Sequence, residues 1–449
     1  MFPLDWRADP RYFRALIKIA RITLNQPIGT MQETDPIYDL IIVGGGPSGA
    51  ASAIYAKRAG LKVLLLDRAT FPRDKICGDA LSGKSIGLLK DLQLLDRVKE
   101  LPGAPINKVV FGSPEHIDAV IDLTRHPLKD IVTGEWVPME GYVIRRKYLD
   151  KLLFEEATKA AADTHQGFRV NDLIWDGDQV CGVRGQMDGE EAERKFRGRL
   201  VLGCDGYNSI VARKTGLYEH DPDHWVVALR CYYEGVTGLE GQIELHFVDE
   251  VSPGYFWAFP LENGYANVGI GMLHSHIKRR NVDLKSALQQ VISRPPFADR
   301  FKNARPAEEP VGWNLPVGSK RRKVYGNGFL LLGDAASLID PFTGEGIGNA
   351  LYSARLAVET AAAAIRANDT SEPFLKRYDD ELWDALGDEF KTSKRLQDLG
   401  RWRMLLNFVI RKAARNKEIS DLMCGMIAQA VPMKYLASPL FYLKLLLKR

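Results

Sequence analysis

Residues 38–67 hold the pattern that most constrains the fold of this 449-residue chain. An apolar run, Tyr38–Val43, leads directly into Gly-Gly-Gly-Pro-Ser-Gly at 44–49, and an alanine-rich segment follows. The glycine spacing is GxGxxG, with a strand expected before it, a helix over Ala50–Ala59 and a second strand over Val63–Asp67. This order of elements predicts the first βαβ unit of a dinucleotide-binding domain.

The glycines and the helix start have separate physical roles. Gly44 permits the tight turn, Gly46 lets a pyrophosphate approach the backbone, and Gly49 lets the helix pack on the strand. The pyrophosphate is expected at the N-terminus of the helix, beside Pro47 and Ser48. Free N–H groups and the helix dipole favour an anion at that place.

An acidic residue follows at the distance that this kind of site requires. The second strand ends at Asp67, eighteen residues beyond Gly49. A carboxylate there can accept hydrogen bonds from a ribose. We therefore expect Asp67 and its neighbour Arg68 to belong to the same cofactor site.

Two later segments resemble those of FAD-dependent hydroxylases and their relatives. Segment 201–213, which contains Asp205, Gly206 and Ser209, resembles their DGxxSxxR segment, with Arg213 one position later than in that pattern. Segment 329–336 carries Gly333 and Asp334 after an apolar run, which is similar to the GD motif of the same superfamily. The resemblance implies FAD as the cofactor, with both aspartates and their adjacent glycines in its site and the aspartate of the GD motif on the ribityl chain.

The continuation of the second segment, 340–349, resembles the loop and helix start that cradle an isoalloxazine ring. Glycine N–H groups at a helix start can stabilise charge near the pyrimidine end of a reduced flavin. Segment 143–149 also fits an RxxL pattern, which implies a place near the cofactor for Arg146. The residues implied in the loop are Pro341, Gly344, Glu345, Gly346 and Ile347.

The stretch 252–271 predicts a sheet face made of large rings. Tyr255, Trp257 and Phe259 alternate as a strand requires, and Pro260 then interrupts the ladder. An apolar and flexible ligand offers few polar groups to recognise. A wall of this kind suits such a ligand, because selectivity must come from shape and hydrophobic transfer.

Two motifs together resemble the geranylgeranyl reductase family, flavoenzymes that saturate double bonds of polyprenyl chains. Segment 253–260 is similar to the family's YxWxFP motif, and 71–79 to its PRxKxCG segment beside the flavin. The resemblance covers about residues 37–390. It implies a p-hydroxybenzoate-hydroxylase-like fold and a place beside the flavin for Lys75, Cys77 and Gly78.

The implied reaction is hydride transfer from reduced FAD to one alkene carbon, while a proton reaches the other. Cys77 and Tyr255 are the two candidate proton donors. Tyr255, Trp257 and Phe259 are expected to line the substrate cavity. His246 is a further candidate for the lining, although a satisfied core histidine is the favoured interpretation. His274 and His276 are interpreted as solvent-exposed turn residues.

Three other functions stay open. A flavin-dependent monooxygenase or halogenase is one, because the halogenase motif GWxWxIP falls on 254–260; Tyr255 and Phe259 depart from it. An electron-transfer flavoprotein with a cysteine-ligated cluster near the C-terminus is disfavoured, because only Cys424 lies there. A flavin-containing membrane scaffold without turnover is the third.

Charge is distributed unevenly along the chain. The net charge of +4 divides into +3 over residues 1–31, −9 over 32–390 and +10 over 391–449. Residues 11–24 and the region around Trp402, Leu405, Leu406 and Val409 have basic, amphipathic patterns with aromatic anchors. They predict contact with an anionic membrane surface, the alternative being that both helices dock on the protein. No motif indicates a nucleic-acid partner.

The five cysteines are scattered and odd in number, which predicts no metal site or disulfide framework and favours a reducing compartment. With neither a secretory signal nor a membrane-spanning run expected, the predicted location is cytoplasmic and peripheral to a membrane. The external reductant stays open between NADPH, NADH and ferredoxin, so a redox partner protein is possible. The substrate's head group stays open as well.

The predicted fold combines a discontinuous Rossmann-type α/β domain with an inserted α+β domain. An N-terminal amphipathic helix covers 1–34, with its helical part at about Pro10 to Leu24. The FAD domain comprises 35–110, 140–215 and 315–375, with helices expected at 85–100, 146–162 and 346–366. An antiparallel substrate domain comprises 111–139 and 216–314, and a helical, basic region covers 376–449.

Overall fold

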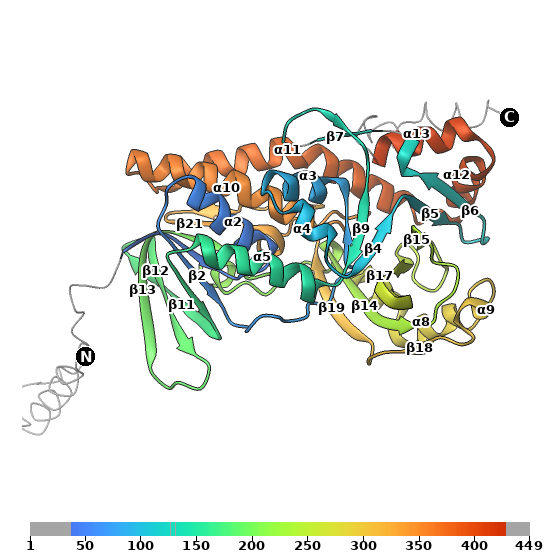
Figure 1. Cartoon of the computed structure of the whole chain (residues 1–449), viewed down its shortest axis with the longest axis horizontal. Coiled ribbons are helices and arrows are strands. Elements are labelled where there is room, and N and C mark those ends of the chain that lie inside the picture. Colours follow the sequence, from blue (N-terminus) through green and yellow to red (C-terminus); the bar gives the residue numbers. More distant parts are fainter. Residues whose placement is uncertain (1–36, 126, 131, 428–449) are drawn as a thin grey trace, which may run out of the picture. The chain divides into compact units, whose positions relative to one another are not determined.

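The computed structural model describes residues 37–125, 127–130 and 132–427 (Figure 1). All of these except Ile37 belong to one compact unit. The predicted N-terminal helix and the last part of the basic C-terminal region, 428–449, lie outside the described residues.

The glycine-rich turn lies at the centre of the first sheet. Strand β1 pairs in parallel with β2 on one side and with β13 on the other, so that Leu40 lies opposite Val63 and Leu200. Within the described residues this sheet has the order β10-β2-β1-β13-β12-β11, with β21 on β13 and β20 on β21. The strands are β1 Tyr38–Val43, β2 Val63–Asp67, β10 Asp163–Gln166, β11 Phe168–Asp176, β12 Gln179–Met187, β13 Glu193–Gly203, β20 Tyr325–Gly326 and β21 Phe329–Leu331.

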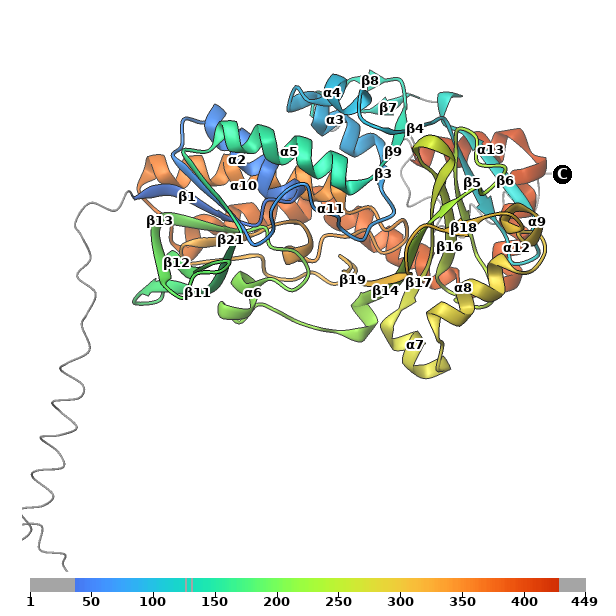
Figure 2. The ribbon, with the colours of Figure 1, turned by 60° about the horizontal axis from the view of Figure 1, so that its bottom comes forward.

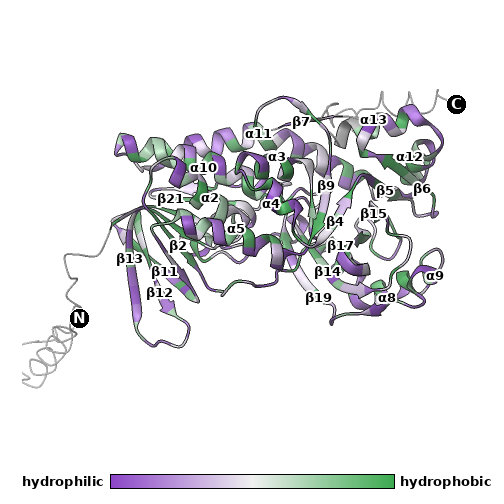
Figure 3. Cartoon of the chain, viewed as in Figure 1, coloured by the Kyte–Doolittle hydropathy of each residue, from purple (hydrophilic) through white to green (hydrophobic). Residues whose placement is uncertain are grey.

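Long helices pack beside this sheet and beside one another. Helix α2 begins at Pro47, directly after the glycines, and contacts both α5 and α10 (Figure 1). Helix α11 packs along α10 and carries both hydrophobic and hydrophilic residues along its length (Figure 3). The helices of this part are α2 Pro47–Arg58, α3 Gly83–Asp91, α4 Leu95–Lys99, α5 Arg146–Ala160, α6 Ile210–Lys214, α10 Ile347–Ala367 and α11 Glu372–Leu399.

The helical region expected at 85–100 is divided into two helices, α3 and α4. Helix α3 ends in a left-handed residue, Gln93, whose φ is 61°. The N–H of Gln93 bonds the carbonyl of Lys90, and the N–H of Leu94 bonds the carbonyl of Leu89. This pair of bonds is a Schellman motif, which satisfies the last carbonyls of α3 and separates it from α4.

A second, mainly antiparallel sheet contains the predicted aromatic strand. Its order is β18-β14-β17-β16-β15-β5-β6, with β19 also paired to β14. Its strands are β5 Lys108–Gly112, β6 Asp118–Asp122, β14 Trp225–Glu234, β15 Gln242–His246, β16 Tyr255–Pro260, β17 Tyr265–Leu273, β18 Arg305–Pro306 and β19 Val311–Pro316. They fall mostly within the segments predicted for the substrate domain, whose boundaries stay a prediction.

Shorter elements connect the two sheets and close the turns. Strands β3 Ala80–Leu81, β9 Gly141–Ile144 and β4 Gly103–Ile106 form one small sheet, and β7 Leu128–Lys129 pairs with β8 Trp136–Val137. Single 3₁₀ turns lie at Leu123–Arg125, Pro222–His224, Glu262–Gly264 and Gly333–Ala336.

The second sheet has two different faces, because side chains alternate along each strand. On one face Phe256, Val268 and Ile270 are buried in a core that includes α8. The helices of this part are α7 His274–Arg280, α8 Leu284–Ile292 and α9 Ala298–Phe301. The expectation that His274 and His276 occupy an exposed turn was wrong, because both belong to α7, and packing of α7 on β17 leaves His276 only 8% exposed.

Two further helices cover the β6 edge of this sheet. They are α12 Arg403–Arg415 and α13 Lys417–Ile427, and both contact β6 (Figure 2). Over the ranges that the structure describes, none of the helices has the length and apolar character needed to cross a bilayer.

Gly49 provides a test of the fold. A Cβ at this position would overlap the carbonyl oxygen of Gly44, whereas a Cβ at Gly312 would meet only the carbonyl oxygen of Ala228, at 3.8 Å. We expect Gly49→Ala to lower the free energy of unfolding by about 3 kcal/mol or more, because the backbone cannot give way. Gly312→Ala should change it by less than about 0.5 kcal/mol. Urea denaturation measures both, and equal effects would contradict the packing described.

Candidate active site

A cavity of about 1050 Å³ extends from the glycine-rich turn to the second sheet. Most of the predicted site residues line it: Gly44, Gly46, Pro47, Ser48, Asp67, Arg68, Lys75, Cys77, Gly78, Arg146, Asp205, Gly206, Tyr255, Trp257, Phe259, Asp334, Gly344, Glu345, Gly346 and Ile347. Gly49, Gly333, Pro341 and His246 do not belong to the lining. The structure thus brings together residues that are up to about 300 positions apart in the sequence.

Two aspartates shape the end of the cavity nearest the glycines. Asp67 accepts hydrogen bonds from the N–H groups of Gly45 at 2.6 Å and Ala69 at 2.7 Å. One oxygen of Asp205 accepts a bond from the N–H of Ile210 at 2.6 Å, while its other oxygen is buried without a partner. Burial raises the pKa of Asp205. A buried acceptor that lacks a donor fits a ligand that brings a hydroxyl group.

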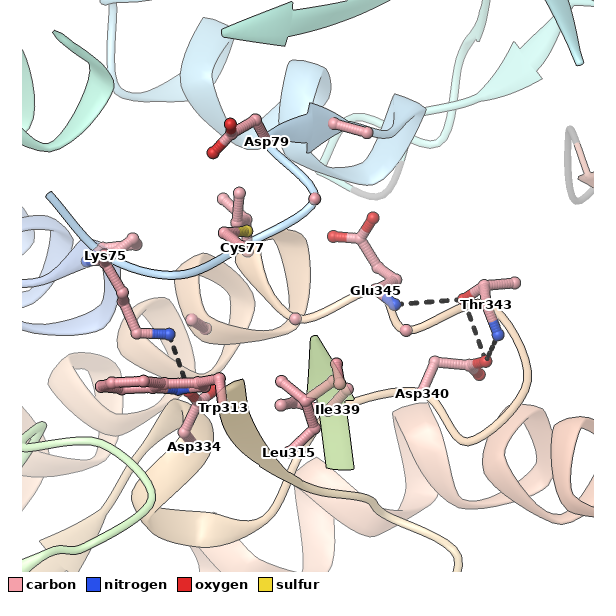
Figure 4. Close-up of a pocket in the computed structure, with 18 of the residues that line it drawn as sticks. Lys75, Cys77, Asp79, Trp313, Leu315, Asp334, Ile339, Asp340, Thr343 and Glu345 are labelled. Atoms are coloured by element: carbon pink, nitrogen blue, oxygen red, sulfur yellow. Dashed lines mark hydrogen bonds and ion pairs between the residues drawn. The ribbon is translucent and has the colours of Figure 1, made fainter. Parts of the chain in front are cut away.

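The middle of the cavity is crossed by an ion pair. Lys75 Nζ lies 3.2 Å from Asp334 Oδ2 and 5.6 Å from the centre of the Trp313 ring (Figure 4). Both side chains are largely buried, so the pair loses little of its strength to solvent. Asp334, whose motif predicts a contact with the ribityl chain, thus lines the cavity and is paired with Lys75.

The loop before α10 is held in shape by carboxylates. Asp340 Oδ1 accepts hydrogen bonds from the N–H groups of Phe342 and Thr343, at 2.9 and 2.8 Å. Glu345 accepts from the N–H of Gly348 at 2.6 Å and from the hydroxyl of Ser85 at 3.3 Å. Burial raises the pKa of Glu345. The loop therefore presents a fixed backbone to the cavity (Figure 4).

The second sheet closes the cavity with the predicted aromatic wall. Tyr255, Trp257 and Phe259 all point into the cavity from β16, and the Tyr255 hydroxyl donates to the Thr343 carbonyl at 3.0 Å. Burial raises the pKa of Tyr255. Neighbouring strands extend the same face with Val109, Phe111, Ile243, Leu245, Trp313 and Leu315.

Gly269 makes room for the indole ring of Trp257 in the aromatic wall. It lies opposite Trp257 on β17, and a Cβ at this position would overlap the indole ring. The missing side chain therefore lets the indole lie against the strand while its other face remains toward the cavity. This glycine is part of the Gly-rich return that follows the aromatic stretch.

Comparisons with known proteins agree with this geometry. Residues 38–384 match the family described as FAD binding domain. A digeranylgeranylglycerophospholipid reductase of Methanopyrus kandleri is 30% identical over 368 residues, which is 81% of this chain and 90% of the relative. The chain belongs to the geranylgeranyl reductase family of FAD-dependent oxidoreductases.

Solved structures support the fold of this reductase family member. A geranylgeranyl bacteriochlorophyll reductase-like protein of Thermoplasma acidophilum has a TM-score of 0.75 at 25% identity and covers 87% of this chain and 96% of its own. The myxobacterial chondrochloren halogenase, also 25% identical, has a TM-score of 0.67 and covers 80% and 82%. The predicted Rossmann-type FAD fold with an antiparallel substrate part and a helical C-terminal region is confirmed.

Four predicted residues of the reductase lie outside the cavity lining. Gly49 lies at the contact between α2 and the turn, and Gly333 lies beside Ser48 and Ala350. The carbonyl of Pro341 accepts a hydrogen bond from Gln397 at 2.7 Å. These three residues support the segments that line the cavity and do not face it themselves.

The candidate place of His246 in the cavity lining was wrong, and the favoured interpretation, a core histidine, is confirmed. The residue alternates with Leu245 on β15 and therefore points to the opposite face of the sheet. Its Nε2 lies 3.0 Å from Glu244, and its ring packs edge-on against Phe297 with centroids 4.8 Å apart. Its buried ion-pair environment makes it a core histidine of the reductase.

The far end of the cavity is apolar and includes part of the C-terminal region. Leu405, Leu406, Val409 and Ile410 of α12 line it together with Met423 of α13. Of the stripe that the sequence suggested for a membrane surface, Leu405, Leu406 and Val409 are half-buried and line the cavity, whereas Trp402 does not. The stripe's basic neighbours Arg403 and Arg411 pair with Asp249 and Glu115. Trp402 and Met404, at the start of the helix, are 67% and 85% exposed.

Sequence reasoning missed a polar network behind Cys77. Asp79 is fully buried and accepts hydrogen bonds from the Tyr232 hydroxyl at 2.7 Å and the Asn267 amide at 2.8 Å. Beside it, Arg146 forms a bidentate pair with Asp150, which also pairs with Arg73 at 2.6 Å. The one sequence signal that could have revealed this network is the position of Asp79, two residues after Cys77.

The same carboxyl group has a displaced pKa. Burial raises the pKa of Asp79 to about 6, against the opposing effects of Tyr232, Arg230 and Asn267. The unfolded chain releases this proton near pH 3.8. Between these values the folded state binds more protons than the unfolded state, so the contribution of Asp79 to stability falls as the pH rises.

This displacement predicts a pH-dependent difference between the wild type and Asp79→Asn. Asparagine tolerates the left-handed backbone of this position, where φ is 66°, and it does not titrate. From pH 4.5 to pH 7 the wild type should lose about 2 kcal/mol of unfolding free energy that the variant keeps. Denaturation of both proteins at the two pH values checks this. Parallel pH profiles would contradict the displaced pKa.

Proposed function

We propose that this protein saturates carbon–carbon double bonds of a polyprenyl chain, using FAD as the source of hydride. The observation that carries the proposal is the continuity of one cavity, which begins at the glycine-rich turn and ends between apolar side chains of α12 and the second sheet. Such a cavity fits a long apolar chain beside a dinucleotide, because hydrophobic transfer supplies the binding energy.

The residues that fit FAD divide along the cavity. The N-terminus of α2 would hold the pyrophosphate, and Asp67 would accept from the ribose. The unpartnered oxygen of Asp205 and the Lys75–Asp334 pair offer an acceptor and charges for the remaining hydroxyl groups. The loop before α10 would support the ring system. Reduced FAD supplies a hydride to one carbon of the double bond.

Cys77 is the favoured donor of the proton that the other alkene carbon needs. It lines the cavity on a segment opposite the loop of Glu345 (Figure 4). Tyr255, the other candidate, holds its proton tightly, because burial raises its pKa and its hydroxyl already donates to Thr343. The guanidinium of Arg146 lies beside the Cys77 thiol. Solvent then returns the proton.

The substrate is proposed to be a lipid with geranylgeranyl-type chains. The relative from Methanopyrus kandleri is named for a digeranylgeranylglycerophospholipid, which favours a glycerophospholipid head group here. A flavin-dependent halogenase is the second candidate, given the chondrochloren halogenase among the structural neighbours. This chain departs from the halogenase motif at Tyr255 and Phe259, and both side chains line the cavity. The departure therefore favours the reductase.

Two features of the wider reaction are also proposed. The protein would collect its substrate at an anionic membrane surface, with exposed Trp402 and Met404 and the basic chain ends as contacts. NADPH, NADH or a ferredoxin would reduce the FAD, the last as a partner protein. Flotation with anionic vesicles tests the membrane contact, and Trp402→Ser should weaken it if this corner inserts.

The first test of function uses a defined lipid. The protein with FAD, reduced by dithionite under argon, should convert digeranylgeranylglycerophospholipid in micelles to products that carry two more hydrogen atoms per reduced bond. Cys77→Ser should lower kcat by about a hundredfold, because general acid catalysis contributes that much. Mass spectrometry of the lipids checks both. A loss below tenfold would contradict the acid role of Cys77, and no reduction by the wild type would contradict the function.

The wall formed by α12 gives a prediction on chain length. Leu406 lines the cavity, whereas Ala414 lies on the same helix, is exposed and does not belong to the lining. Leu406→Trp fills the far end, so turnover of a four-isoprene chain should fall about tenfold while a two-isoprene chain is still reduced. Ala414→Trp is the matched control and should change neither rate. Equal loss with both chain lengths would show that the far end does not hold the chain.

A further inference from the structure

Asn267 joins the aromatic wall to the segment that carries Cys77. Its side chain is fully buried on β17, where it lies opposite Phe259. Asn267 Oδ1 accepts the indole N–H of Trp257 at 2.9 Å. Its Nδ2 donates to the Cys77 carbonyl at 2.7 Å and to Asp79 Oδ2 at 2.8 Å. We call this set of three bonds the Asn267 bridge.

Asp79 fixes the other end of the bridge. Besides the bond from Asn267, its carboxylate accepts from the Tyr232 hydroxyl at 2.7 Å and from the N–H of Arg146, the first residue of α5, at 3.3 Å. The Tyr232 ring is itself held by the guanidinium of Arg230, 3.8 Å from its centre. The segment is therefore anchored to β14, β17 and α5 at once.

The backbone conformation of Asp79 indicates that contacts with other elements hold this residue in place. Its φ of 66° lies in the left-handed region, which costs a non-glycine residue free energy. The surrounding hydrogen bonds offset that cost. The segment from Lys75 to Asp79 forms no helix or strand, so hydrogen bonds to other elements must hold its conformation.

We propose that Asn267 and Asp79 are positioning residues, which hold the Cys77 thiol at a fixed place relative to the indole of Trp257. The reacting double bond must lie between the flavin and the proton donor, and a non-polar alkene has no group by which either could orient it. The wall that grips the chain must therefore keep a constant distance from the donor. The Asn267 bridge supplies that constraint. Its consequence for proton transfer rests on the proposed function.

The test measures exposure of the Cys77 thiol in the FAD-loaded protein. Asn267→Leu removes all three bonds and leaves the Trp257 indole N–H and the Cys77 carbonyl without these partners, while Asp79 keeps its bonds from Tyr232 and Arg146. The segment should then open more often, and alkylation of Cys77 by iodoacetamide should accelerate about tenfold. Mass spectrometry of the Cys77 peptide measures the rate. A rate within twofold of the wild type would overturn the proposal.

Two further variants separate positioning from general destabilisation. Asn327→Leu also removes two side-chain bonds, to Asp178 and to the N–H of Glu372, but Asn327 lies outside the cavity lining. It should leave the Cys77 alkylation rate unchanged. Trp257→Phe keeps an apolar ring but loses the pyrrole part of the indole with its N–H, so it breaks the bond to Asn267 even where Asn267→Leu does not fold. Its acceleration should be about threefold, and none would overturn the proposal.

Kinetics provide the second readout. In Trp257→Phe the lipid's KM should stay within about twofold, because the wall remains apolar, while kcat falls about tenfold through misplacement. A rise in KM with unchanged kcat would overturn the positioning role, because it would show that Trp257 contributes only to substrate binding. Alkylation needs no prenyl substrate. A protein that reduces no prenyl lipid would therefore contradict the proposed function, whereas unchanged alkylation would contradict the bridge.

Discussion

The hydrogen bonds of Asn267 are the interaction on which the site depends. The chain leaves the first sheet at Asp67 and enters the small β3-β9-β4 sheet at Ala80, and much of the segment between them lines the cavity. On the nucleotide side, Lys75 of this segment pairs with Asp334. On the apolar side, Asn267 holds the carbonyl of Cys77. A segment without secondary structure is thus fixed at both ends by buried polar contacts, which are costly to break.

The second sheet gives the cavity its chemical character through simple alternation. Residues of β16 with odd numbers face the cavity and those with even numbers pack toward α8, so a single strand serves a binding wall and a core. The C-terminal helix α12 then closes the far end with aliphatic side chains. A ligand that fits this space needs length and flexibility more than polar groups. A polyprenyl chain has these properties, and the residues that would hold FAD line the rest of the same cavity.

Local patterns predicted the parts of this site that depend on neighbouring residues. The turn at Gly44–Gly49 and the alternation of Tyr255, Trp257 and Phe259 are written into short segments, and both lie as predicted. The network behind Cys77 depends on distant pairs: Tyr232 lies 153 residues from Asp79, and Asn267 lies 188 residues from it. Periodicity could not reveal those contacts. The α12 stripe showed the limit of amphipathicity, because an apolar face looks the same whether it meets lipid or a cavity wall.

The most direct measurement of the central claim is the identity of the molecule that the purified protein retains. Its lipid extract should be analysed by mass spectrometry before and after the bound flavin is reduced with dithionite under argon. The account predicts a polyprenyl lipid that gains two hydrogen atoms with each reduced bond, and its fragments would reveal the head group. A bound prenyl lipid that stays unchanged, or an aromatic ligand in its place, would contradict it.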